Sequence, residues 1–168
     1  AHDDTCLMLA ARCLARGNGN FYLYYKISEE KVVLRTGDRL EYDVYLHPDQ
    51  PVPKGGVDVQ LDEGNVRDSN ARDGDGRRAH GDAILDAAKG RWLRRSIDLS
   101  HLAGRRTERW DLHCEGDPAG LYVQFVDNVE LARADGTRIA VYRDGRPQRD
   151  EIDWREGYGK DARLAVVP

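Results

Sequence analysis

The sequence predicts an all-β protein built as an antiparallel β-sandwich. Apolar and polar residues alternate with a period of two in several segments, which is the pattern of half-buried strands. Clusters of Gly, Pro, Asn and Asp separate these segments, and helical periodicity is weak. About seven strands with turns at such spacing are typical of an antiparallel sandwich. A chain of 168 residues is long enough for one domain of ordinary size plus an appendage.

The first two predicted strands are residues 6–14 and 21–27, on either side of the sequence Gly17-Asn18-Gly19-Asn20. Gly and Asn favour the tight turns that join antiparallel neighbours, so the two segments are predicted to form a hairpin. Residues 40–46 alternate strictly. One face of that strand would carry Leu40, Tyr42, Val44 and Leu46.

Further strands are predicted along the middle of the chain, at residues 57–62, 92–99, 110–114 and 121–131. Helical composition is limited to one or two turns within residues 81–89 and a short turn begun by Ser100.

Residues 1–137 are predicted to form the sandwich domain, whereas residues 138–168 have a different character. Residues 138–142 and 163–167 are strand-like, but the stretch between them is charged and weakly patterned. We expect this C-terminal part either to add edge strands or to begin a following module.

Composition excludes several classes of protein. Charged residues make up 33% of the chain, and no apolar run approaches the roughly 18–20 residues of a membrane helix, so no membrane span is expected. The net charge of −4 argues against a nucleic-acid partner, because phosphate binding needs a basic surface. The start lacks the basic and apolar regions of a signal peptide, and we expect the chain to be cut from a longer protein.

The three cysteines, Cys6, Cys13 and Cys114, are expected to be free and buried, since free cysteine behaves as a small hydrophobic residue. A bridge from Cys6 or Cys13 to Cys114 is the alternative. Motifs of serine hydrolases, zinc proteases and phosphate-binding loops are absent from the sequence, so we expect no catalysis. Glycosidase chemistry would need a carboxylate pair, for which Glu41 with Asp43 or Glu63 with Asp68 are the candidates.

Two segments resemble a known family. Residues 90–104 read Gly-Arg-Trp-Leu-Arg-Arg-Ser-Ile-Asp-Leu-Ser-His-Leu-Ala-Gly, and residues 123–131 read Val-Gln-Phe-Val-Asp-Asn-Val-Glu-Leu. Together with residues 40–46 and 62–69, they resemble the galactose-binding-domain-like jelly rolls that accompany carbohydrate-active enzymes as non-catalytic carbohydrate-binding modules. The resemblance extends over about 95 of the 168 residues.

The resemblance implies a calcium-stabilised accessory module that binds a glycan and contacts neighbouring domains of a larger, extracellular or secreted protein. Two alternatives remain. One is a glycoside-processing enzyme domain, and the other is a purely structural sandwich that packs on a catalytic domain.

Asp127 is the leading candidate for a metal ligand. Its apolar neighbours Val126 and Val129 place it on a core strand, where an unpaired carboxylate is costly. The resembling modules often hold calcium through a carboxylate on this last strand and oxygen ligands near the chain start, which implies Asp127 and Asp4, with Asp3 as a further possibility. Capping a turn or pairing with an arginine is the alternative role for Asp127.

The sugar site is predicted in the polar connection 62–75, where Asp68, Asn70 and Asp75 would bind hydroxyl groups, with an exposed Trp154 as the stacking partner. Interleaved arginines leave open that this loop is simply solvated and self-neutralising. Trp92 and Trp110 are expected in the core. A site on a sheet face is the alternative location, with Tyr22, Tyr24 and Tyr42 as its aromatic candidates.

Overall fold

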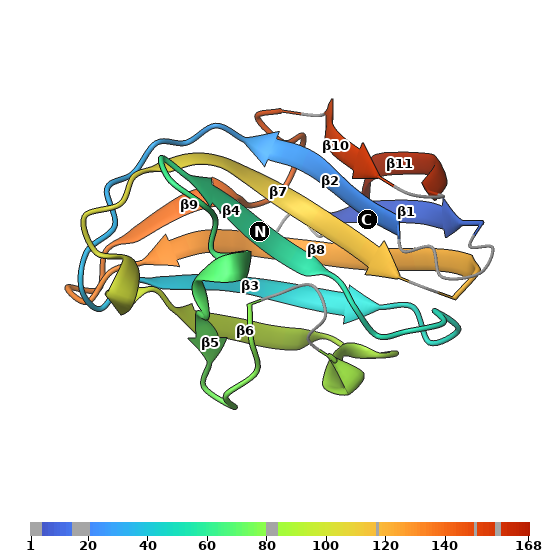
Figure 1. The fold of residues 1–168 in the computed structure, drawn as a ribbon, viewed down its shortest axis with the longest axis horizontal. Helices are drawn as coiled ribbons and strands as arrows, with labels where there is room; N and C mark the ends of the chain where they lie inside the picture. Colours follow the sequence, from blue (N-terminus) through green and yellow to red (C-terminus); the bar gives the residue numbers. More distant parts are fainter. Residues whose placement is uncertain (1–4, 15–20, 80–83, 117, 150, 157–158) are drawn as a thin grey trace.

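The computed structural model consists of two antiparallel β-sheets packed face to face (Figure 1). It describes residues 5–14, 21–79, 84–116, 118–149, 151–156 and 159–168, and the side chains of Phe21 and residues 153–163 are outside the description.

The larger sheet has the strand order β11-β1-β8-β3-β6-β5, and β9 also pairs with β8. The smaller sheet has the order β10-β2-β7-β4. The strands are β1 (Cys6–Cys13), β2 (Phe21–Ser28), β3 (Arg39–Leu46), β4 (Gly56–Leu61), β5 (Arg72–Asp73), β6 (Leu93–Asp98), β7 (Thr107–Gly116), β8 (Gly120–Ala132), β9 (Arg138–Tyr142), β10 (Glu151–Glu156) and β11 (Gly159–Val167).

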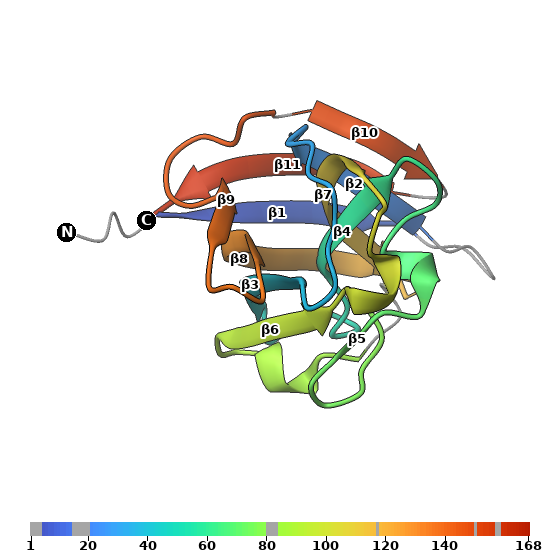
Figure 2. The same ribbon diagram turned by 90° about the vertical axis from the view of Figure 1, so that its left-hand side faces the viewer.

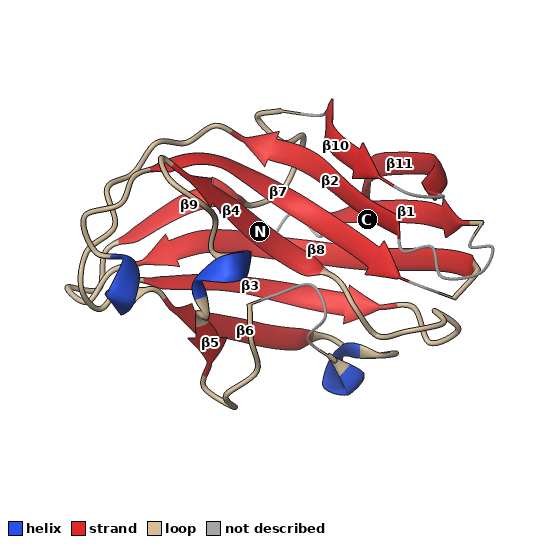
Figure 3. Cartoon of the chain, in the orientation of Figure 1, coloured by secondary structure: helices blue, strands red, loops and turns tan. Residues whose placement is uncertain are grey.

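The predicted all-β sandwich is confirmed. Within the described residues, helix is confined to three single turns of 3₁₀ type (Figure 3). These are η1 (Arg67–Ser69), η2 (Asp86–Ala88) and η3 (Ser100–Leu102), the last of which is the short turn predicted to begin at Ser100. None of these turns has the length and apolarity that a membrane-crossing helix requires.

The core lies between the sheets and is built by the alternation read from the sequence. All four apolar side chains of β3 that were predicted to share a face are fully buried. Residues of β4 and β7 meet them from the other sheet, and Trp110 is the largest of these side chains, with no exposed surface. Its indole Nε1 donates a 2.8 Å hydrogen bond to the carbonyl of Glu30. Each large apolar side chain buried in this way stabilises the fold by about 1.5–3 kcal/mol.

The predicted hairpin of residues 6–14 and 21–27 is wrong. β1 pairs with β8 and β11 in the larger sheet, whereas β2 pairs with β7 and β10 in the smaller one. The chain crosses between the layers so that the apolar face of each strand contributes to the shared core, with Leu7 and Leu9 on one side and Leu23 and Ile27 on the other. The turn sequence at residues 17–20 lies outside the described residues.

The last three strands extend both sheets. β9 pairs with β8, β10 forms an edge of the smaller sheet beside β2, and β11 forms an edge of the larger sheet beside β1. Figure 2 shows β10 and β11 at the end of the molecule opposite β5 and β6. Residues 138–142 therefore pair directly with β8, a central strand of the larger sheet.

The cysteine prediction is confirmed, since Cys6, Cys13 and Cys114 are all free and buried. Of the two tryptophans expected in the core, Trp110 is there, but the expectation for Trp92 is wrong because 51% of its surface is exposed. Trp92 precedes β6 on the face that points away from the core, and the inward position on β6 is taken by Arg95, which is 2% exposed. Arg95 is held there by hydrogen bonds to the hydroxyl of Tyr42 (3.0 Å) and the carboxylate of Asp73 (3.0 Å).

Candidate functional site

The outer face of the larger sheet carries two parallel rows of side chains across β6, β3 and β8. Tyr45 lies opposite Phe125 in register, and Trp92 reaches the other side of Tyr45 from the start of β6. A second row lies two residues further along these strands. There, Asp43 of β3 is opposite Arg94 of β6 on one side and Asp127 of β8 on the other. Because side chains alternate between the faces, both rows point away from the core. We call Trp92, Tyr45 and Phe125 the aromatic row, and Arg94, Asp43 and Asp127 the charged row.

The aromatic row forms the wall of a hollow rather than a flat platform. The ring centroids of Tyr45 and Trp92 are 5.9 Å apart with the rings tilted by 57°, and those of Tyr45 and Phe125 are 5.7 Å apart in an edge-on arrangement. These rings, with Cys6, His47 and Pro168, line a cavity of about 300 Å³. That volume is at the lower end of small-ligand sites, which span about 300–1,000 Å³. The exposed Trp92 beside this hollow, together with Tyr45 and Phe125, makes it a candidate ligand site.

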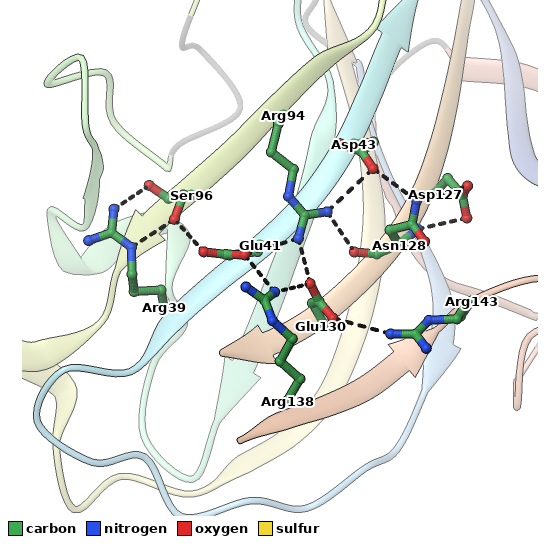
Figure 4. Close-up of polar contacts among 10 residues, drawn as sticks. All are labelled: Arg39, Glu41, Asp43, Arg94, Ser96, Asp127, Asn128, Glu130, Arg138 and Arg143. Carbon is green, nitrogen blue, oxygen red and sulfur yellow. Dashed lines mark hydrogen bonds and ion pairs between the residues drawn. The ribbon is translucent and has the colours of Figure 1, made fainter. Parts of the chain in front are cut away.

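The charged row continues into a network of ion pairs (Figure 4). Glu41 and Glu130 lie directly opposite each other on β3 and β8, an arrangement that would be repulsive without cations. Arg94 and Arg138 both bind the two glutamates, and Arg94 also contacts Asp43 at 3.3 Å. Although burial opposes it, hydrogen bonds from these arginines and from Ser96 hold the pKa of Glu41 below its ordinary value.

An irregularity in β8 places Asp127 beside this network. The pairing of β3 with β8 shifts between Glu41 and Asp43, and Asn128 takes a left-handed conformation with φ of 50°. Such a bulge inserts one extra residue and re-aims the neighbouring side chains. As a result, Asp127 and Glu130 both reach the outer face, and the Nδ2 group of Asn128 donates to Asp43 at 2.9 Å and to Asp127 at 3.1 Å.

Asp127 is half-buried and lies in an electronegative environment. Burial raises the pKa of Asp127, the hydrogen bond from the backbone N–H of Asn128 opposes this rise, and the charges of Asp144 and Asp43 add to it. The charge of Asp127 also acts on its neighbours. Burial raises the pKa of Cys6 and raises that of Tyr142 to about 12, and in both cases the charge of Asp127 adds to the rise.

A calcium site at Asp127 stays a prediction. The described residues contain no group of three or more His, Cys, Asp or Glu side chains placed to hold a metal ion. The oxygens of Asp127 and Asp43 that face each other are occupied by the amide of Asn128. Calcium prefers six to eight oxygen ligands, so the fit is incomplete among these residues. Asp3 and Asp4 lie outside the described residues.

The predicted loop residues do not line the hollow beside the aromatic row, although Asp75 lines a cavity that Arg94 of the charged row also lines. Asp68, in η1, exchanges hydrogen bonds with Asn65, while Asn70 accepts one from Arg78 at 3.0 Å and Asp75 pairs with Arg77. Asn70 lines a cavity of about 350 Å³ and Asp75 lines an adjoining one of about 190 Å³, and both cavities are also lined by Asp73 and Gly74. Each of the three side chains expected to form one sugar site has a hydrogen-bond or ion-pair partner within its own loop, and a sugar site there stays a prediction.

The aromatic residues considered as alternative platforms are covered. Tyr42 is fully buried in the core, and Tyr24 is only 6% exposed because Arg67 hydrogen-bonds its hydroxyl. The guanidinium of Arg67 also lies over the ring of Tyr22, at 5.4 Å from the centroid. Trp154 belongs to β10, where its backbone is opposite Tyr24, and its side chain lies outside the described residues.

The η1 segment, which contains Arg67, covers a buried polar layer on the outer face of the smaller sheet. Asp58 of β4 lies opposite Asp111 of β7, and both are at most 1% exposed. Asp58 accepts backbone hydrogen bonds from Val59 at 2.8 Å and from Arg67 at 2.9 Å. Burial raises its pKa to about 7, the two backbone bonds oppose this, and the charge of Asp111 adds to it. This layer anchors the η1 segment to the sheet.

Sequence reasoning missed the aromatic row, although a signal was present. Tyr45 is one position out of phase with the inward-facing Tyr42, Val44 and Leu46, which puts it on the outer face. Phe125 is likewise out of phase with the buried Val126. The phase of Trp92 relative to Ile97 was readable too, but a tryptophan next to a strand was assigned to the core by residue type.

Neither the protein-family models nor the curated proteins that were searched contain a match to the chain.

Proposed function

We propose that this protein is a non-catalytic carbohydrate-binding module whose glycan site is the hollow beside the aromatic row. The observation that carries the proposal is Trp92, 51% exposed at the rim of a cavity that Tyr45 and Phe125 also line. The C–H face of a pyranose ring is apolar, so an exposed aromatic face removes it from water, as it would any apolar surface.

The charged row supplies the polar half of the site. Residues two apart on a strand are about 6.5–7 Å apart, so Asp43, Asp127 and Arg94 lie about one sugar ring away from the aromatic row. Their carboxylate and guanidinium groups can bind hydroxyls. Arg94 is fixed by its contacts with Glu41, Asp43 and Glu130, which reduces the entropy lost on binding.

Several features favour a binding role over catalysis. Of the carboxylate pairs considered for glycosidase chemistry, Glu41 and Asp43 both contact Arg94, and a lowered pKa makes Glu41 a poor proton donor. Glu63 is largely exposed and pairs with Arg105. We therefore favour an accessory module of a larger, secreted carbohydrate-active protein, similar to the galactose-binding-domain-like jelly rolls.

The alternative is a structural sandwich whose aromatic row packs on a neighbouring domain. Glycan-array screening and affinity-gel electrophoresis of the isolated chain separate the two roles. We expect retention by at least one polysaccharide and loss of that retention in Trp92→Ala.

Leu121→Ala is the matched control, because Leu121 is a 50% exposed apolar residue on the same sheet face outside the lining of the hollow. It should bind as the unmodified protein does. Retention that persists in Trp92→Ala rejects the aromatic row as the site, and absence of binding to every glycan rejects the function.

A further inference from the structure

We infer that the glycan bound beside the aromatic row carries a protonated amine, so that the ligand is an amino sugar rather than a uronic acid. This inference rests on the proposed glycan-binding function and names the substrate class of that site. It follows from how charge is distributed over the outer face of the larger sheet.

The arginines that contact the charged row are already paired with carboxylates. Arg94 is shared by Glu41, Asp43 and Glu130, and Arg138 is shared by the same two glutamates. Each of these arginines therefore meets at least as many carboxylates as it can neutralise. A negatively charged ligand would have to compete with carboxylates that are already held in place.

Asp127 is the carboxylate that lacks such a partner. Its hydrogen bonds come from the backbone N–H and the side-chain amide of Asn128, which carry no charge. Across the part of the chain that the structure describes, no ion pair to Asp127 is found within 4.0 Å, and the nearby Asp43 and Asp144 add negative charge. Arg143, the cation that acts on it at longer range, contacts Glu130 at 3.5 Å.

This carboxylate borders the hollow. Cys6 lines the hollow. Because β1 and β8 are antiparallel and Leu7 is paired with Val126, the next position along the two strands places Cys6 beside Asp127. Burial raises the pKa of the Cys6 thiol, and the charge of Asp127 adds to this rise. Phe125, which also lines the hollow, precedes Asp127 by two residues on the same face of β8.

A protonated amine fits both halves of this site. A half-buried carboxylate without a cation gains from a charge-assisted hydrogen bond, which is shorter and stronger than a neutral one. The faces of Trp92 and Tyr45 also attract a cation through their π electrons. A uronate would instead place its carboxylate beside Asp43 and Asp127, where like charges repel.

The test compares four oligosaccharides of equal length by isothermal titration calorimetry. They are a β-1,4-glucosamine oligomer, its N-acetylated counterpart, a neutral cello-oligosaccharide and an oligogalacturonate. The buffer contains a chelator, so that no divalent cation occupies Asp127, and has low ionic strength. We expect the glucosamine oligomer to bind at least about fivefold more tightly than the N-acetylated one, and the galacturonate to bind most weakly.

Two variants make the test specific. Asp127→Asn keeps the side-chain acceptor for the N–H of Asn128 and should abolish the preference for the free amine, so that the glucosamine oligomer and its N-acetylated counterpart bind this variant with similar affinity. Asp135→Asn removes the same charge from an exposed turn and should leave the preference intact.

The outcomes separate the two levels of the argument. Equal affinities for the acetylated and free-amine oligomers overturn the inference but leave glycan binding in place. A preference lost equally in both variants also overturns it, since it would then reflect the net negative charge of the whole protein. Absence of binding to all four oligosaccharides and to the glycan array overturns the proposed function itself.

Discussion

Replacing Asp58 with asparagine should remove much of the pH dependence of stability in this protein. Asp58 is 1% exposed and its pKa is raised to about 7 by burial and by the charge of Asp111, against the lowering effect of two backbone hydrogen bonds. A group whose pKa is raised in the folded state holds its proton more tightly there than in the unfolded chain. Its contribution to stability is therefore present at low pH and is lost as the pH rises to about 7.

The magnitude follows from the width of that window. Between pH about 5 and 7, the folded state keeps the proton that the unfolded state has released, and each pH unit changes the free energy of unfolding by about 1.4 kcal/mol. The unmodified protein should therefore lose about 3 kcal/mol of stability between pH 5 and pH 8 through this residue. Asparagine has no proton to lose and can still accept the backbone bonds of Val59 and Arg67 through Oδ1.

Urea denaturation at pH 5 and pH 8 measures the effect. We expect Asp58→Asn to be more stable than the unmodified protein at pH 8 and to show a flatter profile, whereas the exposed control Asp135→Asn should follow the profile of the unmodified protein. A variant with the same pH slope as the unmodified protein would refute the assignment of that slope to Asp58. So would a variant destabilised equally at both pH values.

Three further predictions concern the tryptophans, the metal and the loop. Trp110→Ala should lower the free energy of unfolding by about 3–5 kcal/mol in urea denaturation, whereas the exposed Trp92→Ala should change it far less; similar losses would contradict their placement. If calcium binds at Asp127, a chelator should lower the melting temperature measured by calorimetry and Asp127→Ala should abolish that sensitivity, while an unchanged melting curve for protein shown to be metal-free counts against the metal. Asp68→Ala combined with Asn70→Ala should leave glycan retention in affinity gels unchanged, and loss of retention at an unchanged melting temperature would move the site to the loop.

The sequence allowed most strands, though not β5 and β10, to be predicted, but it did not allow their neighbours to be predicted. The alternation of β3 was readable because each residue reports its own preference for the core. Partner choice depends on contacts between distant segments, and for this reason the hairpin of β1 and β2 was predicted where the two strands in fact belong to different sheets. A local turn signal carries no information about the competing partners β7 and β8.

The errors at the candidate site arise because alternation tells which residues share a face of a strand but not which face points toward the core. The adjacent Arg94 and Arg95 must face opposite sides of a strand, but the sequence does not say which one points inward. Arg95 is inside because Asp73 and Tyr42 neutralise and bind it, and these partners come from β5 and β3. Once Arg95 points inward, Trp92 must point outward. The aromatic row is therefore a consequence of a buried ion pair formed by residues far apart in sequence.

The pairing of the first strands with the last determines when the fold can be completed during synthesis. β1 receives its outer neighbour from β11 and β2 from β10, so neither sheet is complete until residues 151–167 have left the ribosome. Pairings this distant in sequence are slow to form, typically in milliseconds to seconds. A nascent or truncated chain that stops at residue 137 would present the backbone edges of β1 and β2 side by side, unpaired and open to a second chain. In the complete fold, β11 and β10 cover these edges of β1 and β2.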